Sequence, residues 1–218
     1  LYHIGQQTGR RVKSDWDSLE QQDNSNHVLI RKHGVEKWWR TVCATVEPWD
    51  WDAELVSMFS EEDFAKKFQA DNEGKFGFNV GCGASNLGSA GLDLTRPGKK
   101  GMGGSKLYDS HPDIVADARN IPCRPGSLDY IFASHIIEHV VDPFDLLVEW
   151  KKAIKPDGRL YLVVPDNDRM AVIAIDASHV HAYTPAVMTK ILAVSGWDII
   201  TVEEFARAGS FGIVARPR

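Results

Sequence analysis

Four of the eight histidines in the chain form two closely spaced pairs, His135 with His139 and His179 with His181. Histidine changes its charge near neutral pH, so it is a common general base in proteins. Glu138 directly precedes His139. Imidazole and carboxylate groups together can also hold a divalent metal ion, and this mixture favours zinc or another transition metal over magnesium. A metal site is less favoured here than a histidine base. A structural interpretation, in which Glu138 and His139 only brace a loop, also stays open.

The order His135-x-x-Glu138-His139 has the spacing of the inverted zinc-protease motif. That motif lies within a helix and has a distant third ligand. Here the pattern begins where an apolar strand is expected to end, so we reject a zinc protease.

A glycine turn and the acid that follows it form the second group of residues that could take part in binding or chemistry. Gly81-Cys82-Gly83 follows an apolar segment at 76–80, and Asp93 stands near the end of the next one, 90–94. Glycine lets the backbone approach a ligand where a Cβ atom would collide. An acid at the end of the second strand can accept hydrogen bonds from a ribose diol. The pattern predicts a site for a nucleoside cofactor.

The same turn argues against a nicotinamide or flavin dinucleotide. Asn86 stands where the third glycine of G-x-G-x-x-G would be, and Asp93 follows Gly81 by 12 positions, against about 20 in the dinucleotide fingerprint. Little more than one turn of helix fits between the two strands. The phosphate-binding signature GxxxxGK[ST] is also absent from the sequence.

Short apolar segments alternate with helical ones after residue 76, which indicates parallel βαβ units. Strands are predicted at 76–80, 90–94, 113–116, 128–133, 159–164, 197–205 and 210–215, and helices at 142–154 and 185–195. The last two strands leave no room for a helix and should pair as a hairpin. Pro156-Asp157-Gly158 should end the first helix. We therefore predict an α/β fold, a Rossmann-like doubly wound seven-stranded sheet with six parallel strands and one antiparallel strand.

The N-terminal region differs from the rest of the chain. Residues 1–72 hold five of the seven tryptophans, and Ser60 followed by three acids resembles a helix start. We expect a helical, aromatic-rich cap over 1–72, either structural or a lid over the acceptor site, and a cofactor-binding domain over 73–218.

Composition limits which binding partners and which cellular compartment are expected. A net charge of -5 does not favour nucleic acid. No apolar run approaches the roughly 20 residues of a membrane span, so none is expected. Three cysteines without a disulfide or CxxC pattern predict a reducing, cytoplasmic compartment.

Residues 76–216 resemble the class I S-adenosylmethionine-dependent methyltransferases of the type-11 kind. Five elements carry the resemblance in the family's order: 81–84, Asp93, Asp117 within 115–122, 127–134 and 155–160. The resemblance implies S-adenosylmethionine as the cofactor, with the turn around its methionine end, Asp93 on the ribose and Asp117 on the adenine amine. The implied cofactor-binding residues are Asn79, Gly81, Cys82, Gly83, Asp93, Leu94, Asp117, Ala118 and Ser134.

Two features refine the resemblance. Asn79 stands where the family has an acid for the cofactor's amine, and its neutral oxygen would bind more weakly. The pattern of 133–139 is similar to a subgroup associated with glycan and sugar modification. The resemblance thus implies O-methylation of a sugar, glycan or other small hydroxylated acceptor. His179 or His181 would be the base, and His135 and His139 acceptor contacts. The alternatives are N- or C-methylation of a small metabolite, or a non-catalytic module.

Overall fold

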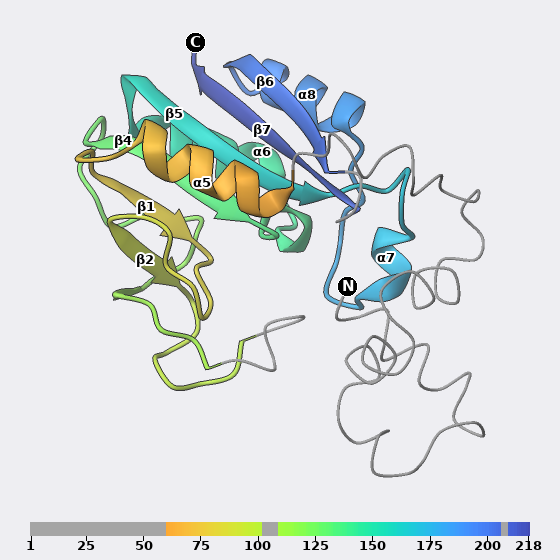
Figure 1. The fold of residues 1–218 in the computed structure, drawn as a ribbon, viewed down its shortest axis with the longest axis horizontal. Helices are drawn as coiled ribbons and strands as arrows, with labels where there is room; N and C mark the ends of the chain where they lie inside the picture. Colours follow the sequence, from red (N-terminus) through yellow and green to blue (C-terminus); the bar gives the residue numbers. More distant parts are fainter. Residues whose placement is uncertain (1–59, 102–108, 206–208) are drawn as a thin grey trace.

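The computed structural model describes residues 60–101, 109–205 and 209–218, which form one seven-stranded sheet in the order β3-β2-β1-β4-β5-β7-β6 (Figure 1). The strands are β1 (Gly77–Val80), β2 (Ala90–Asp93), β3 (Ile114–Val115), β4 (Leu128–Ser134), β5 (Ile154–Pro165), β6 (Trp197–Phe205) and β7 (Ser210–Pro217). The helices are α5 (Glu61–Asp71), α6 (Pro143–Ala153), α7 (Val172–Ile175) and α8 (Pro185–Val194), with a 3-10 turn η3 (Ile137–His139).

The sheet is mixed. Strands β3, β2, β1, β4 and β5 pair in parallel, and β7 is antiparallel to both β5 and β6. The predicted seven-stranded mixed sheet and its closing hairpin are confirmed. The finer prediction of six parallel strands agrees with the strand directions but not with the pairing, because β6 pairs only with β7. The carboxyl ends of β1, β2, β4 and β5 share one edge, where open α/β sheets bind ligands.

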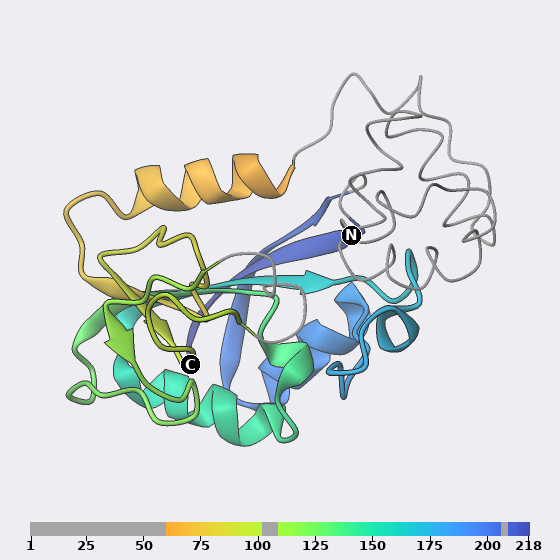
Figure 2. The same ribbon diagram turned by 90° about the horizontal axis from the view of Figure 1, so that it is seen from below.

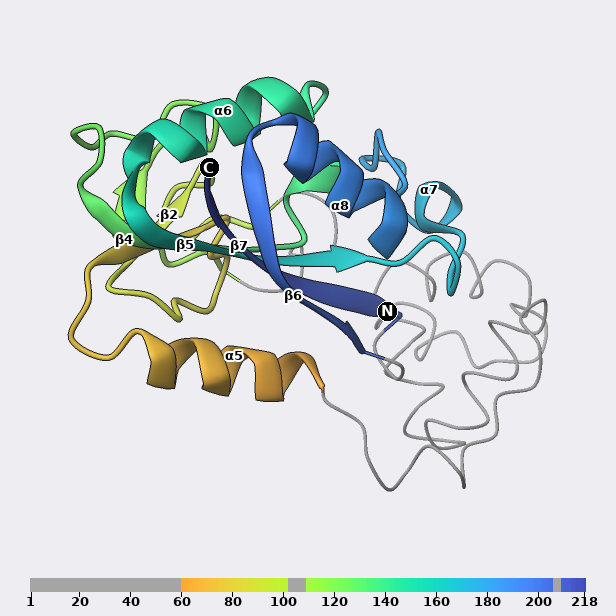
Figure 3. The same cartoon turned by 90° about the horizontal axis from the view of Figure 1, so that it is seen from above.

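Described helices cover both faces of the sheet, as Figures 2 and 3 show. Helices α6 and α8 lie on one face, where Trp150 and Leu192 are fully buried in the main core. Helix α5 lies on the other face, over an aromatic cluster. Its rings Phe64 and Phe68 pack against Tyr130, Phe132, Tyr161 and Phe205. Apolar packing on both faces therefore fixes the position of the sheet, whose carboxyl edge forms the candidate site.

Local sequence signals explain where the helices begin. Ser60 and Asp63 form a capping box at the start of α5, as the pattern of hydroxyl and acids predicts. Asp142 caps α6, and Pro143 occupies its first turn. Helix α6 ends at Ala153, before the predicted stop at 156–158, because Ile154 already pairs with Leu128 in the sheet.

Two expectations about the N-terminal half have different outcomes. The short helix expected between β1 and β2 does not form, and residues 81–89 are turns and bends. Helix α5 falls within the range assigned to the cap, whereas the five tryptophans lie outside the described residues. The boundary between 1–72 and 73–218 stays a prediction. None of the described helices is long and apolar enough to cross a membrane.

Candidate functional site

The glycine turn at the end of β1 has two glycines in left-handed conformations, Gly81 at φ +70° and Gly83 at φ +54°. They face different surroundings. A Cβ atom on Gly81 would lie 1.9 Å from Cδ1 of Ile136, so this glycine makes room for the segment after β4. A Cβ atom on Gly83 would have no described atom within 4 Å. Gly83 therefore presents bare backbone to open space, as a ligand-binding turn requires.

Asp93, at the end of β2, is tied to this turn. Its Oδ2 accepts a hydrogen bond from the Gly83 amide at 2.9 Å, and its Oδ1 accepts one from the Thr95 amide at 2.7 Å. An ionised carboxylate has about four acceptor positions, so Asp93 can bind these amides and still accept bonds from a diol.

Asn79 and Cys82 line the protein side of the turn. The buried Asn79 donates from Nδ2 to the Ser85 carbonyl at 2.9 Å, which fastens the loop after the turn to β1. A carboxylate could not donate this bond. Burial raises the pKa of the Cys82 thiol to about 12, with the charges of Asp93 and Asp113 adding to the effect. Cys82 is therefore a neutral packing group, and its predicted contact with the cofactor stays a prediction.

Asp117 follows β3 at the same edge of the sheet. It accepts hydrogen bonds from Nε of Arg119 at 3.0 and 3.1 Å, and this guanidinium holds the carboxyl pKa below its ordinary value. The carbonyl of Ala118 accepts a bond from Trp150 Nε1 at 2.9 Å, which anchors the loop on the core. Asp117 is thus ionised and held at the predicted adenine side.

The other two residues implied for the cofactor lie at strand ends. Leu94, directly after β2, is 62% exposed, and Ser134 is the last residue of β4. Both stand at the carboxyl edge with the glycine turn.

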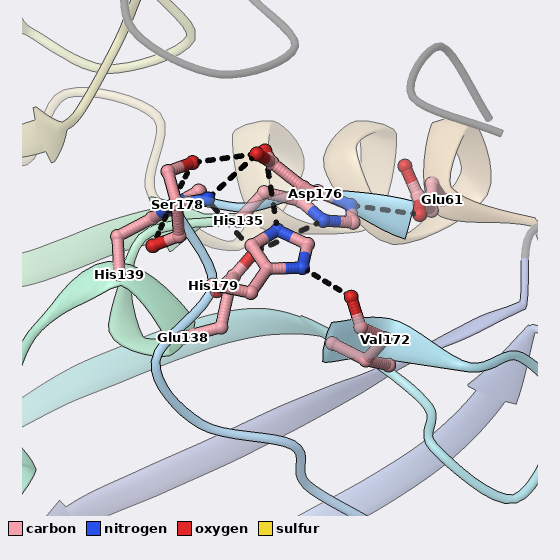
Figure 4. A network of polar contacts seen from close by, with 8 residues as sticks. All are labelled: Glu61, His135, Glu138, His139, Val172, Asp176, Ser178 and His179. Atoms are coloured by element: carbon pink, nitrogen blue, oxygen red, sulfur yellow. Dashed lines mark hydrogen bonds and ion pairs between the residues drawn. The ribbon is translucent and has the colours of Figure 1, made fainter. Parts of the chain in front are cut away.

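The structure brings three of the four predicted histidines together around Glu138 (Figure 4). Glu138 is 0% exposed. Its Oε1 lies 3.5 Å from His135 Nδ1, 3.9 Å from His139 Nε2 and 3.9 Å from His179 Nε2. We call these four residues the Glu138 cluster. His181 is not a member, because its Nε2 lies 3.0 Å from the Val141 carbonyl.

The outer nitrogens of two cluster histidines have hydrogen-bond partners. His179 Nδ1 lies 2.8 Å from the Val172 carbonyl, which can only accept, so this nitrogen carries the proton. His139 Nδ1 lies 3.2 Å from the Ser178 carbonyl and 3.1 Å from Ser178 Oγ. That hydroxyl donates to Asp176 Oδ1 at 2.8 Å and so accepts from His139. In the neutral form of each ring, Nε2 then carries the lone pair and lies 3.9 Å from Glu138 Oε1.

His135 is in a different electrostatic state. Its Nδ1 faces Glu138, and its Nε2 lies 3.3 Å from Glu61 Oε1 of helix α5. Burial alone would lower the pKa of His135, but the nearby carboxylates of Glu138 and Glu61 outweigh it and raise the pKa to about 10. His135 is therefore an imidazolium at neutral pH and can donate a hydrogen bond, but it cannot act as a base.

Sequence reasoning missed three residues of this arrangement. Glu61 resembles an ordinary acid in a first helical turn, yet it binds His135 and also accepts from Ser210 Oγ. Asp176 and Ser178 precede His179, and Asp176 Oδ2 lies 3.7 Å from His179 Nε2. Their proximity to the second histidine pair was the only signal available.

Comparisons with known proteins show what this site-bearing region is similar to. Residues 79–162 match the family model described as "Methyltransferase domain". This part of the chain is therefore similar to a methyltransferase domain.

Curated proteins of similar sequence include the ubiquinone biosynthesis O-methyltransferase of Pseudomonas paraeruginosa. It is 26% identical over 104 residues, which are 41% of this chain and 44% of that protein. The malonyl-[acyl-carrier protein] O-methyltransferase of Marinomonas sp. is 31% identical over 85 residues, 36% of this chain and 31% of that protein. The chain spans less than half the length of the curated relatives it matches.

Solved structures share the fold of this chain. The 1,6-didemethyltoxoflavin-N1-methyltransferase of Burkholderia thailandensis, bound to S-adenosylhomocysteine, has a TM-score of 0.53 and 13% identity, covering 70% of this chain and 76% of that one. The chain therefore has the fold of S-adenosylmethionine-dependent methyltransferases, with the glycine turn, Asp93 and the Glu138 cluster at its ligand-binding edge.

Proposed function

We propose that the chain transfers a methyl group from S-adenosylmethionine to a hydroxyl oxygen of a sugar, glycan or other small hydroxylated acceptor. The observation that carries the cofactor assignment is the turn at Gly83, which faces open space and is held by Asp93. The match of residues 79–162 to the methyltransferase domain supports the same cofactor. The proposed compartment is the cytoplasm, on the basis of the cysteine content.

The cofactor residues would divide along the sheet edge. The turn would wrap the methionine end, Asp93 would accept from the ribose hydroxyls, and Asp117 would lie at the adenine. Asp93 ends β2 and Asp117 follows the neighbouring strand β3, so the two sites would be adjacent.

The acceptor would lie on the side of the Glu138 cluster. Ile136 touches the position of Gly81, so the cluster is next to the glycine turn. His135, as an imidazolium, would donate a hydrogen bond to the acceptor, and His179 would receive the hydroxyl proton. Methyl transfer from a sulfonium depends mainly on in-line positioning, and a base contributes when the acceptor is a hydroxyl. The sugar or glycan class rests on the residue pattern of 133–139.

Calorimetry with S-adenosylmethionine is the first test. Wild type should bind, and Asp93→Asn should weaken binding about tenfold or more, since a hydrogen bond to a charged group contributes about 1.5–3 kcal/mol. Asp198→Asn, in an exposed ion pair with Arg218, is the matched control and should bind as wild type does. Absence of binding in wild type would overturn the proposal.

Methyl-labelled cofactor with a panel of sugars, nucleotide sugars and phenols then tests the reaction. A new O-methyl signal in the product NMR spectrum supports the proposal. An N- or C-methyl product would contradict the acceptor atom, and cofactor binding without any transfer would indicate a non-catalytic module.

A further inference from the structure

We propose that Glu138, His139 and His179 form a binding site for one divalent transition-metal ion, with zinc as the reference metal. One ligand atom from each residue lies within 4.8 Å of the other two. Ligands about 2.1 Å from a tetrahedral ion are about 3.4 Å apart, against 3.9 Å from Glu138 Oε1 to each Nε2. Contraction of these two separations by about half an ångström, with the two imidazole nitrogens also approaching from within 4.8 Å, would complete the site.

The buried carboxylate is the first independent observation. Glu138 is 0% exposed, and neither of its oxygens accepts a hydrogen bond in the described part of the chain. An ionised carboxylate removed from water carries a large free-energy cost unless it is paired or bound to a metal. His135 at 3.5 Å supplies one partial partner. The Glu138 carboxylate would instead bind a divalent ion directly, and His135 would lie on the side of the carboxylate away from the ion.

The second observation is the orientation of the two imidazoles. Metal-binding histidines almost always donate their other ring N–H to a carbonyl or carboxylate, which fixes the tautomer and the ring direction. His179 does so to Val172, and His139 to Ser178. Each Nε2 atom thereby carries the lone pair and lies 3.9 Å from Glu138 Oε1, and His179 Nε2 also lies 3.7 Å from Asp176 Oδ2. A loop brace alone does not require this arrangement.

The residue types select the class of metal. Two imidazoles and one carboxylate suit zinc or another first-row transition metal, whereas magnesium prefers oxygen ligands. Three protein ligands leave a fourth position for an exogenous group. His139 is the more accessible of the two histidines, with 29% of its side chain exposed against 6% for His179. Access to the open position is therefore expected from the side of His139.

The role of the ion in methyl transfer rests on the proposed function, whereas the binding of the ion to Glu138, His139 and His179 does not. With an ion bound, His179 would be a ligand and no longer the base. An acceptor hydroxyl in the open position would then lose its proton to solvent at a lower pH, because the ion stabilises the alkoxide. The alkoxide oxygen would attack the methyl carbon, forming the O–C bond as the S–C bond breaks. The products would be the methyl ether, neutral S-adenosylhomocysteine and one proton, and the metal would keep its oxidation state.

Metal titration of the untagged full chain tests the site without any cofactor. After removal of metals with a chelator, wild type should bind one equivalent of Zn²⁺ by calorimetry and bind Mg²⁺ far more weakly. Glu138→Gln, His139→Gln and His179→Gln should each weaken Zn²⁺ binding by at least about 100-fold, since even outer partners of ligands contribute about 10–100-fold. His181→Gln removes a nearby histidine outside the cluster and should bind Zn²⁺ as wild type does.

Two outcomes would overturn the site: wild type that takes up no Zn²⁺, or a Glu138→Gln variant that binds Zn²⁺ as tightly as wild type. His139→Gln keeps the test decisive if Glu138→Gln does not fold, because His139 is partly exposed. The Co²⁺ absorption spectrum of wild type should also show a low-symmetry four- or five-coordinate site, which the His139 variant should lose. Binding of S-adenosylmethionine is measured separately, so failure of the metal site and failure of the proposed function are distinguishable.

Discussion

The glycine turn offers the sharpest test of where the cofactor binds, through the substitution Gly83→Ala. Gly83 has φ +54°, a conformation that costs an L-residue about 1–2 kcal/mol. No described atom lies within 4 Å of the new methyl group, so no steric cost is added within the protein. A change of 1 kcal/mol lowers Tm by about 2–4 °C in a domain of about this size. The expected loss of Tm is therefore small.

Cofactor affinity should respond much more strongly. The methyl group would project into the space proposed for the methionine end of the cofactor, where backbone and ligand must approach closely. We expect Gly83→Ala to weaken S-adenosylmethionine binding at least about tenfold, or about 1.4 kcal/mol. Calorimetry with S-adenosylmethionine and S-adenosylhomocysteine measures this loss, and thermal unfolding measures stability.

Gly126→Ala is a matched control. Gly126 has φ +62° and, like Gly83, no described atom within 4 Å of an added Cβ. It precedes β4, at the opposite edge of the sheet, where its amide donates to the Lys152 carbonyl at 2.8 Å. The two variants should lose similar stability, but Gly126→Ala should keep wild-type affinity. If Gly83→Ala binds within twofold of wild type, the proposed position of the cofactor is wrong.

Three further substitutions test how the sheet holds the site. Asn79→Asp should lower the free energy of unfolding by about 1–3 kcal/mol in thermal denaturation, because a buried carboxylate cannot donate to the Ser85 carbonyl; an unchanged or higher Tm would contradict this. Lys155 Nζ lies 2.6 Å from Asp129 Oδ1 and lowers the pKa of that carboxyl in the folded state. The pair therefore stabilises the fold at pH values above the unfolded-state pKa of about 3.9, and this stabilisation is lost as the pH falls through the lower folded-state pKa. Asp129→Asn should therefore lower the free energy of unfolding by at most about 1 kcal/mol at pH 7 in urea, and the difference from wild type should disappear in acid. A difference that stays constant down to low pH would refute the ion pair. Phe68→Ala should cost about 3–5 kcal/mol by removing the centre of the aromatic cluster under α5, and a loss below 1 kcal/mol would show that α5 does not dock as described.

Much of the fold was readable from local sequence, because the signals act over a few residues. Apolar segments bounded by glycine or acids marked the strands, and β1, β2 and β4 begin or end within one residue of their predicted limits. Ser60 with its acids marked the start of α5. The end of α6 was less predictable, since pairing of Ile154 with Leu128, far away in the sequence, overrides the local stop signal.

The sequence by itself determined the residue types of the site: a glycine turn, an acid after β2, and histidines next to Glu138. The tertiary structure alone decided their chemistry. Packing of α5 brings Glu61 to His135 and makes it an imidazolium, which no spacing in the sequence encodes. The path of the loop after α7 directs His179 to Glu138 and His181 to a carbonyl, although only one residue stands between them. Protonation and ligand geometry depend on contacts between distant segments, and these exist only once the sheet and its helices have assembled.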